Sequence, residues 1–204
     1  MTAFTQAQAT DILRALGFRI RTTAEYRQAV EVFQGGYRLG PELGNDRVDG
    51  IVGPHTTAAL ARSEATRRAG GSTASAHFSY GEFTCKCGGK HDGCRRIVVL
   101  GALIDALEAL RAKHYPGGLV VTSGYRCVAH NTSVGGAARS QHLYGAAADV
   151  AQVAKTSQVK ALGRFSGIGY KGSTGKVQHV DVRHVSPANT TGSTTASPAL
   201  WQYS

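Results

Sequence analysis

The feature that most constrains this chain is a set of polar, metal-binding side chains that stand far apart in the sequence. Residues 140–149 read SQHLYGAAAD, which places small residues between His142 and Asp149, and His179 follows 30 residues later. Two imidazoles and a carboxylate make a three-ligand set for Zn²⁺ that leaves a fourth position for water. A fold that uses all three must bring a loop, the strand that follows it and a later strand to one point.

Each part of this set also has a purely structural interpretation. A single histidine on a strand is most often a satisfied polar residue, and the small residues at 145–148 are compatible with tight packing alone. His179 and Asp181 are two residues apart on a predicted strand, so they share one face, but such a pair also occurs at the surface between strands. The combination favours a metal site over these alternatives.

The combination resembles a known group of peptidases. The pattern S-x-H-x-x-G-x-A-x-D stands at residues 140–149, S-G-Y-R at 123–126 and H-V-D at 179–181. These motifs are similar to those of the zinc D-Ala-D-Ala carboxypeptidases and related peptidoglycan peptidases. The same group includes the vancomycin-resistance dipeptidases, phage L-alanyl-D-glutamate endolysins and the hedgehog signalling domain. The resemblance covers about residues 77–185.

The resemblance implies that one catalytic zinc ion is bound by three side chains: His142, Asp149 and His179. It implies that Arg126 holds a substrate carboxylate or stabilises the oxyanion, for which a planar guanidinium is better suited than a lysine. Ser140 and Tyr170 are candidate substrate-binding residues that also support the metal ligands by hydrogen bonding.

Asp181 is the candidate general base. Many relatives carry an acid three positions before the last metal ligand, but Lys176 stands there in this chain. Asp181 is then the nearest carboxylate, and it would take the proton of the zinc-bound water and pass it to the leaving amine. An exchange of roles between His179 and Asp181 stays open, because some relatives carry H-x-H and use its second position for metal.

The first third of the chain carries the pattern of three short helices. Apolar spacing and helix-start signals predict helices over residues 5–17, from a capping box at Thr22, and from Pro54. The strings AVEVFQ at 29–34 and VDGIVGPHT at 48–56 resemble the three-helix peptidoglycan-binding domain. The alternative is that these residues only cap and pack the helices.

Three regions are therefore expected. Residues 1–65 form a wall-binding three-helix module, 66–76 form a flexible linker rich in Gly, Ser and Thr, and 77–204 form the catalytic domain. The catalytic domain is expected to be α+β with a mostly antiparallel sheet. Its expected elements are a long amphipathic helix at 96–114, a helix at 155–165 and short strands at 119–122, 168–170 and 177–182.

All four cysteines fall in the expected catalytic domain: Cys85, Cys87, Cys94 and Cys127. Two disulfides are the favoured expectation, since a wall enzyme works in an oxidising place, and three pairings are possible. A structural zinc site with four cysteines and a set of free thiols are the alternatives. The C-x-C spacing of the first pair is unusual for a zinc knuckle, which normally has two to four residues between its cysteines.

Composition limits the classes of partner. The chain has 204 residues and a net charge of +10, and residues 71–204 carry 14 Lys and Arg against 6 Asp and Glu. Such a surface suits an anionic partner. The basic residues are scattered and match no nucleic-acid motif, and no apolar run is long enough to span a membrane. The expected partner of a monomeric chain is bacterial peptidoglycan, with no nucleic acid and no membrane insertion.

These observations favour a zinc metallopeptidase that cleaves stem peptides or cross-links of peptidoglycan. The first residues lack the basic start and apolar core of a signal peptide. The chain is therefore expected to be made in the host cytoplasm and to act at the cell wall after release, as a phage endolysin does. The alternatives are a secreted bacterial D-Ala-D-Ala carboxypeptidase and a non-catalytic wall-binding protein that retains the fold.

Overall fold

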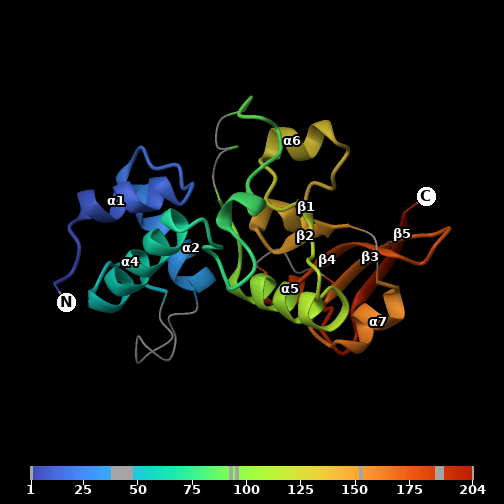
Figure 1. Cartoon of the computed structure of the whole chain (residues 1–204). Coiled ribbons are helices and arrows are strands. Elements are labelled where there is room, and N and C mark those ends of the chain that lie inside the picture. Colours follow the sequence, from blue (N-terminus) through green and yellow to red (C-terminus); the bar gives the residue numbers. More distant parts are fainter. Residues whose placement is uncertain are drawn as a thin grey trace.

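Three helices come first in the structure, a computed structural model, and they lie together at one end of the molecule (Figure 1). They are α1 (Gln6–Ala15), α2 (Thr23–Tyr37) and α4 (Pro54–Arg68). The structure describes residues 2–37, 48–91, 94, 97–151, 154–186 and 191–203. Across these ranges, no helix combines the length and the apolar character needed to cross a membrane.

The three helices begin where the sequence signals predict. The side chain of Glu25 accepts the backbone N–H of Thr22 at 3.1 Å, and Thr22 Oγ1 accepts the N–H of Glu25 at 3.2 Å, which completes the capping box of α2. Pro54 occupies the first turn of α4, where its missing N–H costs no hydrogen bond.

The DGIVGP motif is held by one buried amide, that of Gln34. Its Nε2 donates to Asp49 Oδ1 at 2.9 Å and to the Ile51 carbonyl at 3.0 Å, while its Oε1 accepts the N–H of Gly50 at 3.0 Å. Gln34 is only 3% exposed, so these bonds satisfy a polar group that would otherwise be costly to bury. The Phe33-Gln34 pair and the DGIVGP sequence at 49–54 therefore have a structural role in joining α2 to α4.

Five strands form one sheet in the order β1-β2-β4-β3-β5. Their bounds are β1 (Val121–Ser123), β2 (Ala147–Val150), β3 (Gly167–Lys171), β4 (Val177–Asp181) and β5 (Ala199–Tyr203). The first four pair antiparallel, as expected. Strand β5 was not anticipated; it pairs parallel with β3 and makes the sheet mixed.

Helices α5 (Gly101–His114), α6 (Val128–Ser133) and α7 (Thr156–Ala161) accompany the sheet, with 3₁₀ turns η1 (Tyr80–Phe83), η2 (Gln141–Tyr144) and η3 (Arg183–Val185). Helix α5 begins at Gly101, although its apolar stripe predicted a start near 96. The N–H of Leu100 donates to the carbonyl of Gly145 at 2.9 Å, and Leu100 has an extended conformation. A tertiary hydrogen bond thus delays the start of the helix.

The N-terminal helices and the rest of the protein share one hydrophobic core. Tyr80 of η1 is fully buried, with its ring centroid 5.1 Å from that of Phe18 and 6.1 Å from that of Phe33. Helix α2 also contacts α5. Aromatic rings from both parts are thus in contact where the two parts meet.

The segment expected to be a flexible linker is packed in this structure. Helix α4 runs through its first residues, and Thr73 and Ala74 are buried. The carboxylate of Glu108 on α5 accepts the Ser75 hydroxyl at 2.6 Å and the His77 N–H at 2.9 Å. The segment is thus fastened to α5, and the domain boundary at this point stays a prediction.

Candidate active site

Three elements bring the predicted metal ligands together. His142 lies on η2, Asp149 on β2 and His179 on β4, where Asp149 and His179 are direct partners across the strand pair. His142 Nε2 lies 3.2 Å from Asp149 Oδ1 and 3.1 Å from His179 Nδ1, and the latter two atoms are 2.9 Å apart. Nitrogen and oxygen ligands about 2.0–2.1 Å from a tetrahedral zinc ion lie about 3.3 Å from one another. The triangle of donor atoms is close to that size.

The outer nitrogens of both imidazoles are already bonded to acceptors. His142 Nδ1 is 2.6 Å from the carbonyl of Gly124, so it carries the proton. His179 Nε2 is 3.2 Å from Asp181 Oδ2 and donates to it. In the neutral rings, His142 Nε2 and His179 Nδ1 then hold lone pairs that face each other and a carboxylate oxygen. Lone pairs that converge on one point favour a bound cation, and two imidazoles with a carboxylate are a donor set that zinc prefers.

Backbone geometry requires a glycine at position 145 of the motif that carries His142 and Asp149. Gly145 follows η2 with φ +66°, a left-handed conformation that side chains disfavour. A Cβ at this position would also overlap the carbonyl of Val98. The turn therefore requires glycine in order to lead from His142 into the strand that carries Asp149.

Burial and charge set the protonation of the three ligands. The pKa of Asp149 lies well below its ordinary value, because burial, which would raise it, is outweighed by the close contacts of the carboxylate with His142 and His179. Burial lowers the pKa of His142. Burial acts in the same direction on His179, but its hydrogen bonds to Asp149 and Asp181 raise its pKa overall. The carboxylate and at least one imidazole are thus in the form that binds metal.

Arg126 reaches the same point from the SGYR motif. Its guanidinium forms an ion pair with Asp149 Oδ2, and its Nε donates to Ser123 Oγ at 3.1 Å. The side chain is 18% exposed and lines the pocket over the metal ligands. Arg126 therefore lies at the pocket, beside the candidate metal ligands.

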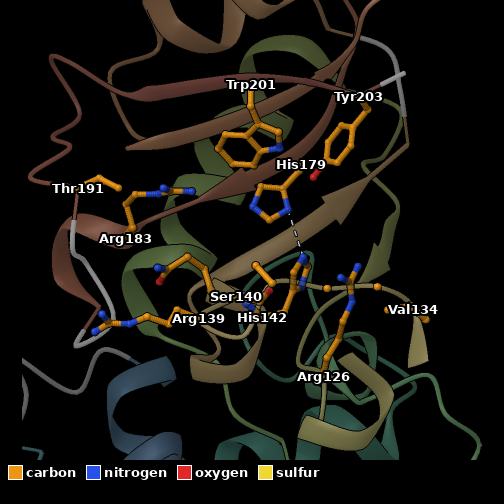
Figure 2. A pocket seen from close by; sticks show the side chains of 14 residues that line it. Arg126, Val134, Arg139, Ser140, His142, His179, Arg183, Thr191, Trp201 and Tyr203 are labelled. Atoms are coloured by element: carbon orange, nitrogen blue, oxygen red, sulfur yellow. Dashed lines mark hydrogen bonds between the residues drawn. The ribbon is translucent and has the colours of Figure 1, made fainter. Parts of the chain in front are cut away.

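A pocket of about 460 Å³ opens over His142 and His179. Figure 2 shows Trp201 and Tyr203 on one side of His179, with Arg126 and Arg139 on the other. The ring centroid of Trp201 lies 5.0 Å from that of His179. The metal-binding atoms are thus at the wall of a cavity that a substrate can enter.

The family comparison agrees with this geometry. Residues 76–186, more than half of the chain, match the family described as Peptidase M15. The chain belongs to the Peptidase M15 family. M15 peptidases are zinc-dependent metallopeptidases, and His142, Asp149 and His179 all fall within the matched region. A comparison with curated proteins found no match.

Asp181 of this M15 peptidase lies elsewhere than a general base would. Its side chain is fully buried behind the ring of His179, on the Nε2 side, whereas the Nδ1 side faces the other ligands. Both of its oxygens are also bonded to Arg183, with Oδ2 2.6 Å from Nη2 and Oδ1 2.9 Å from Nε. Arg183 and His179 hold the pKa of Asp181 at about 2, although burial opposes them. The imidazole separates this carboxylate from the position where a water would bind.

Two further predicted residues have different outcomes. Ser140 lines the pocket of the M15 peptidase, and its Oγ accepts the N–H of His142 at 3.4 Å. Tyr170 does not reach the pocket. On β3 its neighbour Gly169 is paired with Trp201, which faces the pocket, and Tyr170 itself is paired with Gln202. Because side chains alternate along a strand, Tyr170 points to the opposite face.

Sequence reasoning missed the far wall of the pocket in this M15 peptidase. That wall contains Trp201 and Tyr203 from β5; Arg139 and Arg183, which line the same pocket, were missed as well. The alternation of two aromatics in ALWQY was the available signal, since residues two apart share a strand face. Burial raises the pKa of Tyr203, so its phenol keeps its proton and can donate a hydrogen bond into the pocket.

Proposed function

We propose that this chain is a zinc peptidase that hydrolyses peptide bonds in the stem peptides or cross-links of bacterial peptidoglycan. The observation that carries the proposal is the convergence of His142 Nε2, Asp149 Oδ1 and His179 Nδ1 at the wall of a pocket with arginines around it. Zinc bound there would lower the pKa of a water and polarise the scissile carbonyl.

The arginines suit a peptide that carries carboxylates. Arg126 is paired with Asp149, and Arg183 with Asp181. Arg139, by contrast, is exposed at the pocket and has no hydrogen-bonding or ionic partner among the described residues. A guanidinium of this kind is free to bind a carboxylate in bidentate fashion. Stem peptides end in a free carboxylate, which we assign to Arg139, while Arg126 stabilises the oxyanion.

We assign Asp181 to positioning His179 in place of the general-base role that the sequence suggested. A carboxylate that accepts the outer N–H of a metal-binding histidine fixes its tautomer and its ring orientation. The 3.2 Å contact from His179 Nε2 to Asp181 Oδ2, with Arg183 on both oxygens, has this arrangement.

The test measures amine release from purified peptidoglycan by the zinc-loaded full chain, with and without a chelator. We expect release that the chelator abolishes and that added zinc restores. Mass spectrometry of the fragments names the bond: loss of a terminal D-alanine indicates a carboxypeptidase, and cleavage within a stem or cross-link indicates an endopeptidase.

Two variants control this experiment. His142→Ala removes a metal ligand and should abolish release, whereas Tyr170→Phe, on the opposite face of the sheet, should leave it unchanged. Arg139→Gln should raise KM for substrates with a free carboxylate more than it lowers kcat. Zinc-loaded protein that releases no amine would overturn the peptidase proposal and favour a binding protein that retains the fold.

We further propose that the N-terminal helices bind the cell wall and that the chain acts as an endolysin. The resemblance of residues 29–34 and 48–56 to a peptidoglycan-binding domain supports this, as does Ile51, whose side chain in that motif is 65% exposed. Ile51→Asp in the full chain should weaken sedimentation with insoluble peptidoglycan and leave the hydrolysis of a soluble stem peptide unchanged. Equal sedimentation of both proteins would exclude binding through this motif.

A further inference from the structure

All four cysteines of the chain meet in one buried cluster, outside the pocket of the active site. Three come from the short stretch between residues 85 and 94, and the fourth, Cys127, begins helix α6. The exposed fractions range from 1% for Cys94 to 8% for Cys85 and Cys87. Chain segments that are distant in the sequence thus gather the four thiols in one cluster.

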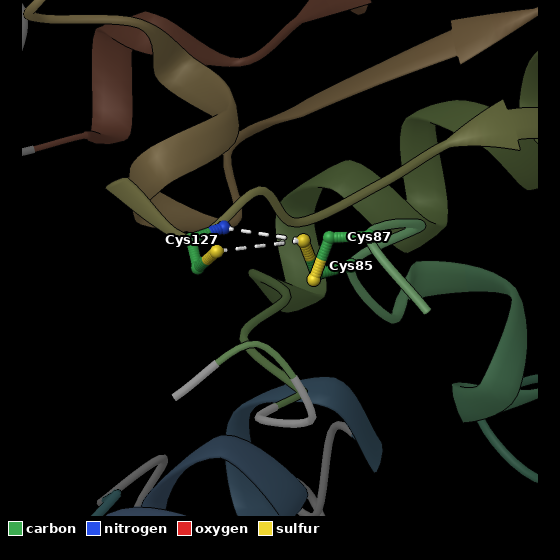
Figure 3. A group of neighbouring side chains, drawn as sticks. All are labelled: Cys85, Cys87 and Cys127. Carbon is green, nitrogen blue, oxygen red and sulfur yellow. Dashed lines mark hydrogen bonds between the residues drawn. The ribbon is translucent and has the colours of Figure 1, made fainter. Parts of the chain in front are cut away.

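The sulfur atoms have the spacing of metal ligands. Cys85 Sγ lies 3.8 Å from Cys127 Sγ, and these two and Cys87 Sγ all lie within 4.8 Å of one another (Figure 3). The Cys94 thiol contacts the Cys87 sulfur. A disulfide bond is about 2.05 Å long, whereas thiolates about 2.3 Å from a tetrahedral zinc ion lie about 3.8 Å apart.

Backbone N–H groups are directed at the sulfurs. The N–H of Cys127 donates to Cys85 Sγ at 3.4 Å, and the N–H of His130, in the first turn of α6, donates to Cys127 Sγ at 3.4 Å. Thiolates bound to a metal commonly accept such bonds, which orient the ligand and spread its charge. The protein thus provides polar partners that a pair of bridged cysteines would not need.

The turn after Cys87 is built in the same manner. Gly88 and Gly89 have φ values of +67° and +85°; the N–H of Gly89 is directed at Cys87 Sγ, and the N–H of Lys90 donates to the Cys87 carbonyl at 3.4 Å. Successive N–H groups in such a turn form a concave site for negative charge. Consecutive left-handed residues need glycine, so the Gly88-Gly89 pair allows the turn that lies next to Cys87 Sγ.

Positively charged residues lie close to the cysteine cluster in the sequence, which suits a metal site with a net negative charge. A zinc ion with four thiolates carries two net negative charges. The exposed residues Lys86 and Lys90 lie beside Cys87 in the chain, and Arg126 precedes Cys127. The two lysines are close enough in sequence to offset part of the charge of such a site while their ammonium groups stay in water.

We propose that Cys85, Cys87, Cys94 and Cys127 bind a second zinc ion, which has a structural role. The ion would join residues 85–94 to the segment 124–127. That segment contains the Gly124 carbonyl that orients His142 and the Arg126 side chain that holds Asp149. Cys85 and Cys87 have an unusual C-x-C spacing for a zinc site. The fold adds Cys127, from outside residues 85–94, as a further ligand.

The test is the metal content of full-length protein produced with added zinc and purified under reducing conditions. We expect two zinc ions per chain in the wild type, and one each in His142→Ala and Cys127→Ser. Lys86→Ala, which changes the residue between two ligands, should retain two. Cobalt-substituted His142→Ala should show intense thiolate-to-metal charge-transfer absorption, because only the cysteine site remains.

A second measurement covers the case in which Cys127→Ser does not fold. Titration of the folded wild type with an organic mercurial should release one zinc ion as the four thiols react. The proposal is overturned if His142→Ala holds no zinc, or if the intact mass of protein purified without reductant shows two disulfides at full activity. If instead wild type and His142→Ala both hold one zinc with thiolate absorption, the cysteine site stands and the catalytic zinc fails.

Discussion

His142 and His179 each have one ring nitrogen bonded to an acceptor behind them and the other directed at Asp149. This arrangement fixes both tautomers before any metal arrives. Because His142 and His179 are 1% and 6% exposed, their rings cannot turn away from this point into solvent. The site is therefore preorganised for a cation, and the residues that orient the rings matter as much as the ligands.

The first prediction concerns Asp181→Asn. The amide keeps the shape of the side chain but removes the negative charge that His179 Nε2–H and Arg183 share. We expect zinc affinity to fall about 10–100-fold, as for other residues that orient a metal ligand. Competition with a chromophoric chelator measures this.

Activity at saturating zinc separates the two roles of Asp181. A positioning residue should lose most of its effect once the site is filled, so kcat should recover substantially. A variant with unchanged zinc affinity and almost no kcat would restore the general-base assignment. Tyr170→Phe is the matched control on the neighbouring strand, and neither quantity should change.

The second prediction concerns pH. Asp149 and Asp181 raise the pKa of His179 above its ordinary value, so in metal-free protein this ring keeps its proton to a higher pH than a free histidine does. Zinc must displace that proton. Its affinity should therefore fall as pH falls through the raised pKa, by about tenfold per pH unit for one displaced proton. Chelator competition over a pH series measures the slope, and a flat profile near neutrality would contradict the prediction.

The convergence of the three candidate metal ligands was predictable from the motifs that carry His142, Asp149 and His179. The loop-to-strand motif with its glycine, and the pairing of residues two apart, are set by backbone geometry that the sequence shows. The position of Asp181 was not predictable in the same way. Sequence places it on the same strand face as His179, but the orientation of the His179 ring decides which nitrogen faces the carboxylate, and the contact of His179 Nδ1 with Asp149 that sets this orientation appears only in the folded chain.

Among the helices and strands, β5 is the element that could not be predicted from the sequence. It pairs parallel with β3, about 30 residues earlier, and it lies beyond residue 186, where the family match ends. A long-range parallel pairing leaves no local signal comparable to a hairpin turn. Helix α5 shows the same limit, because Leu100 follows the helical apolar pattern but donates to Gly145 instead.

The third prediction follows from β5. Trp201→Ala removes a ring that lies 5.0 Å from His179 and also 5.0 Å from the guanidinium of Arg183. We expect kcat/KM on a soluble stem peptide to fall about 3–10-fold, in line with the energy of aromatic contacts. Steady-state kinetics of the zinc-loaded enzyme measure the change.

Leu200→Ala is the matched control on the same strand, since that side chain is 46% exposed. It should retain wild-type kcat/KM. Equal losses in the two variants would show that β5 acts through stability of the sheet, and not through the wall of the pocket.

In the whole molecule, the N-terminal helices and the rest of the chain share one hydrophobic core, whereas the sequence predicted a module, a linker and a catalytic domain. Phe18, which follows α1, and Phe33 of α2 pack on Tyr80, whose hydroxyl also donates to the Phe33 carbonyl at 3.4 Å. Contacts of this kind couple the unfolding of the two parts. A sequence read segment by segment shows the helices but not the aromatic contacts between them.

The fourth prediction tests this coupling. Phe33 is fully buried, so Phe33→Ala should lower the free energy of unfolding by about 3–5 kcal/mol. Differential scanning calorimetry of the zinc-loaded protein should show one transition, shifted as a whole in the variant. Two transitions, of which only one moves, would establish that the N-terminal helices unfold as an independent module.

The parallel pairing of β5 also affects how this protein can be shortened. A chain cut at residue 186, where the family match ends, would keep His142, Asp149 and His179 but leave the outer edge of β3 without its partner strand. An unpaired edge presents a row of N–H and C=O groups to other copies of the chain. Such a fragment would bind zinc and still self-associate through β3, so insolubility of the trimmed protein would reflect a missing strand and not a defect in the metal site.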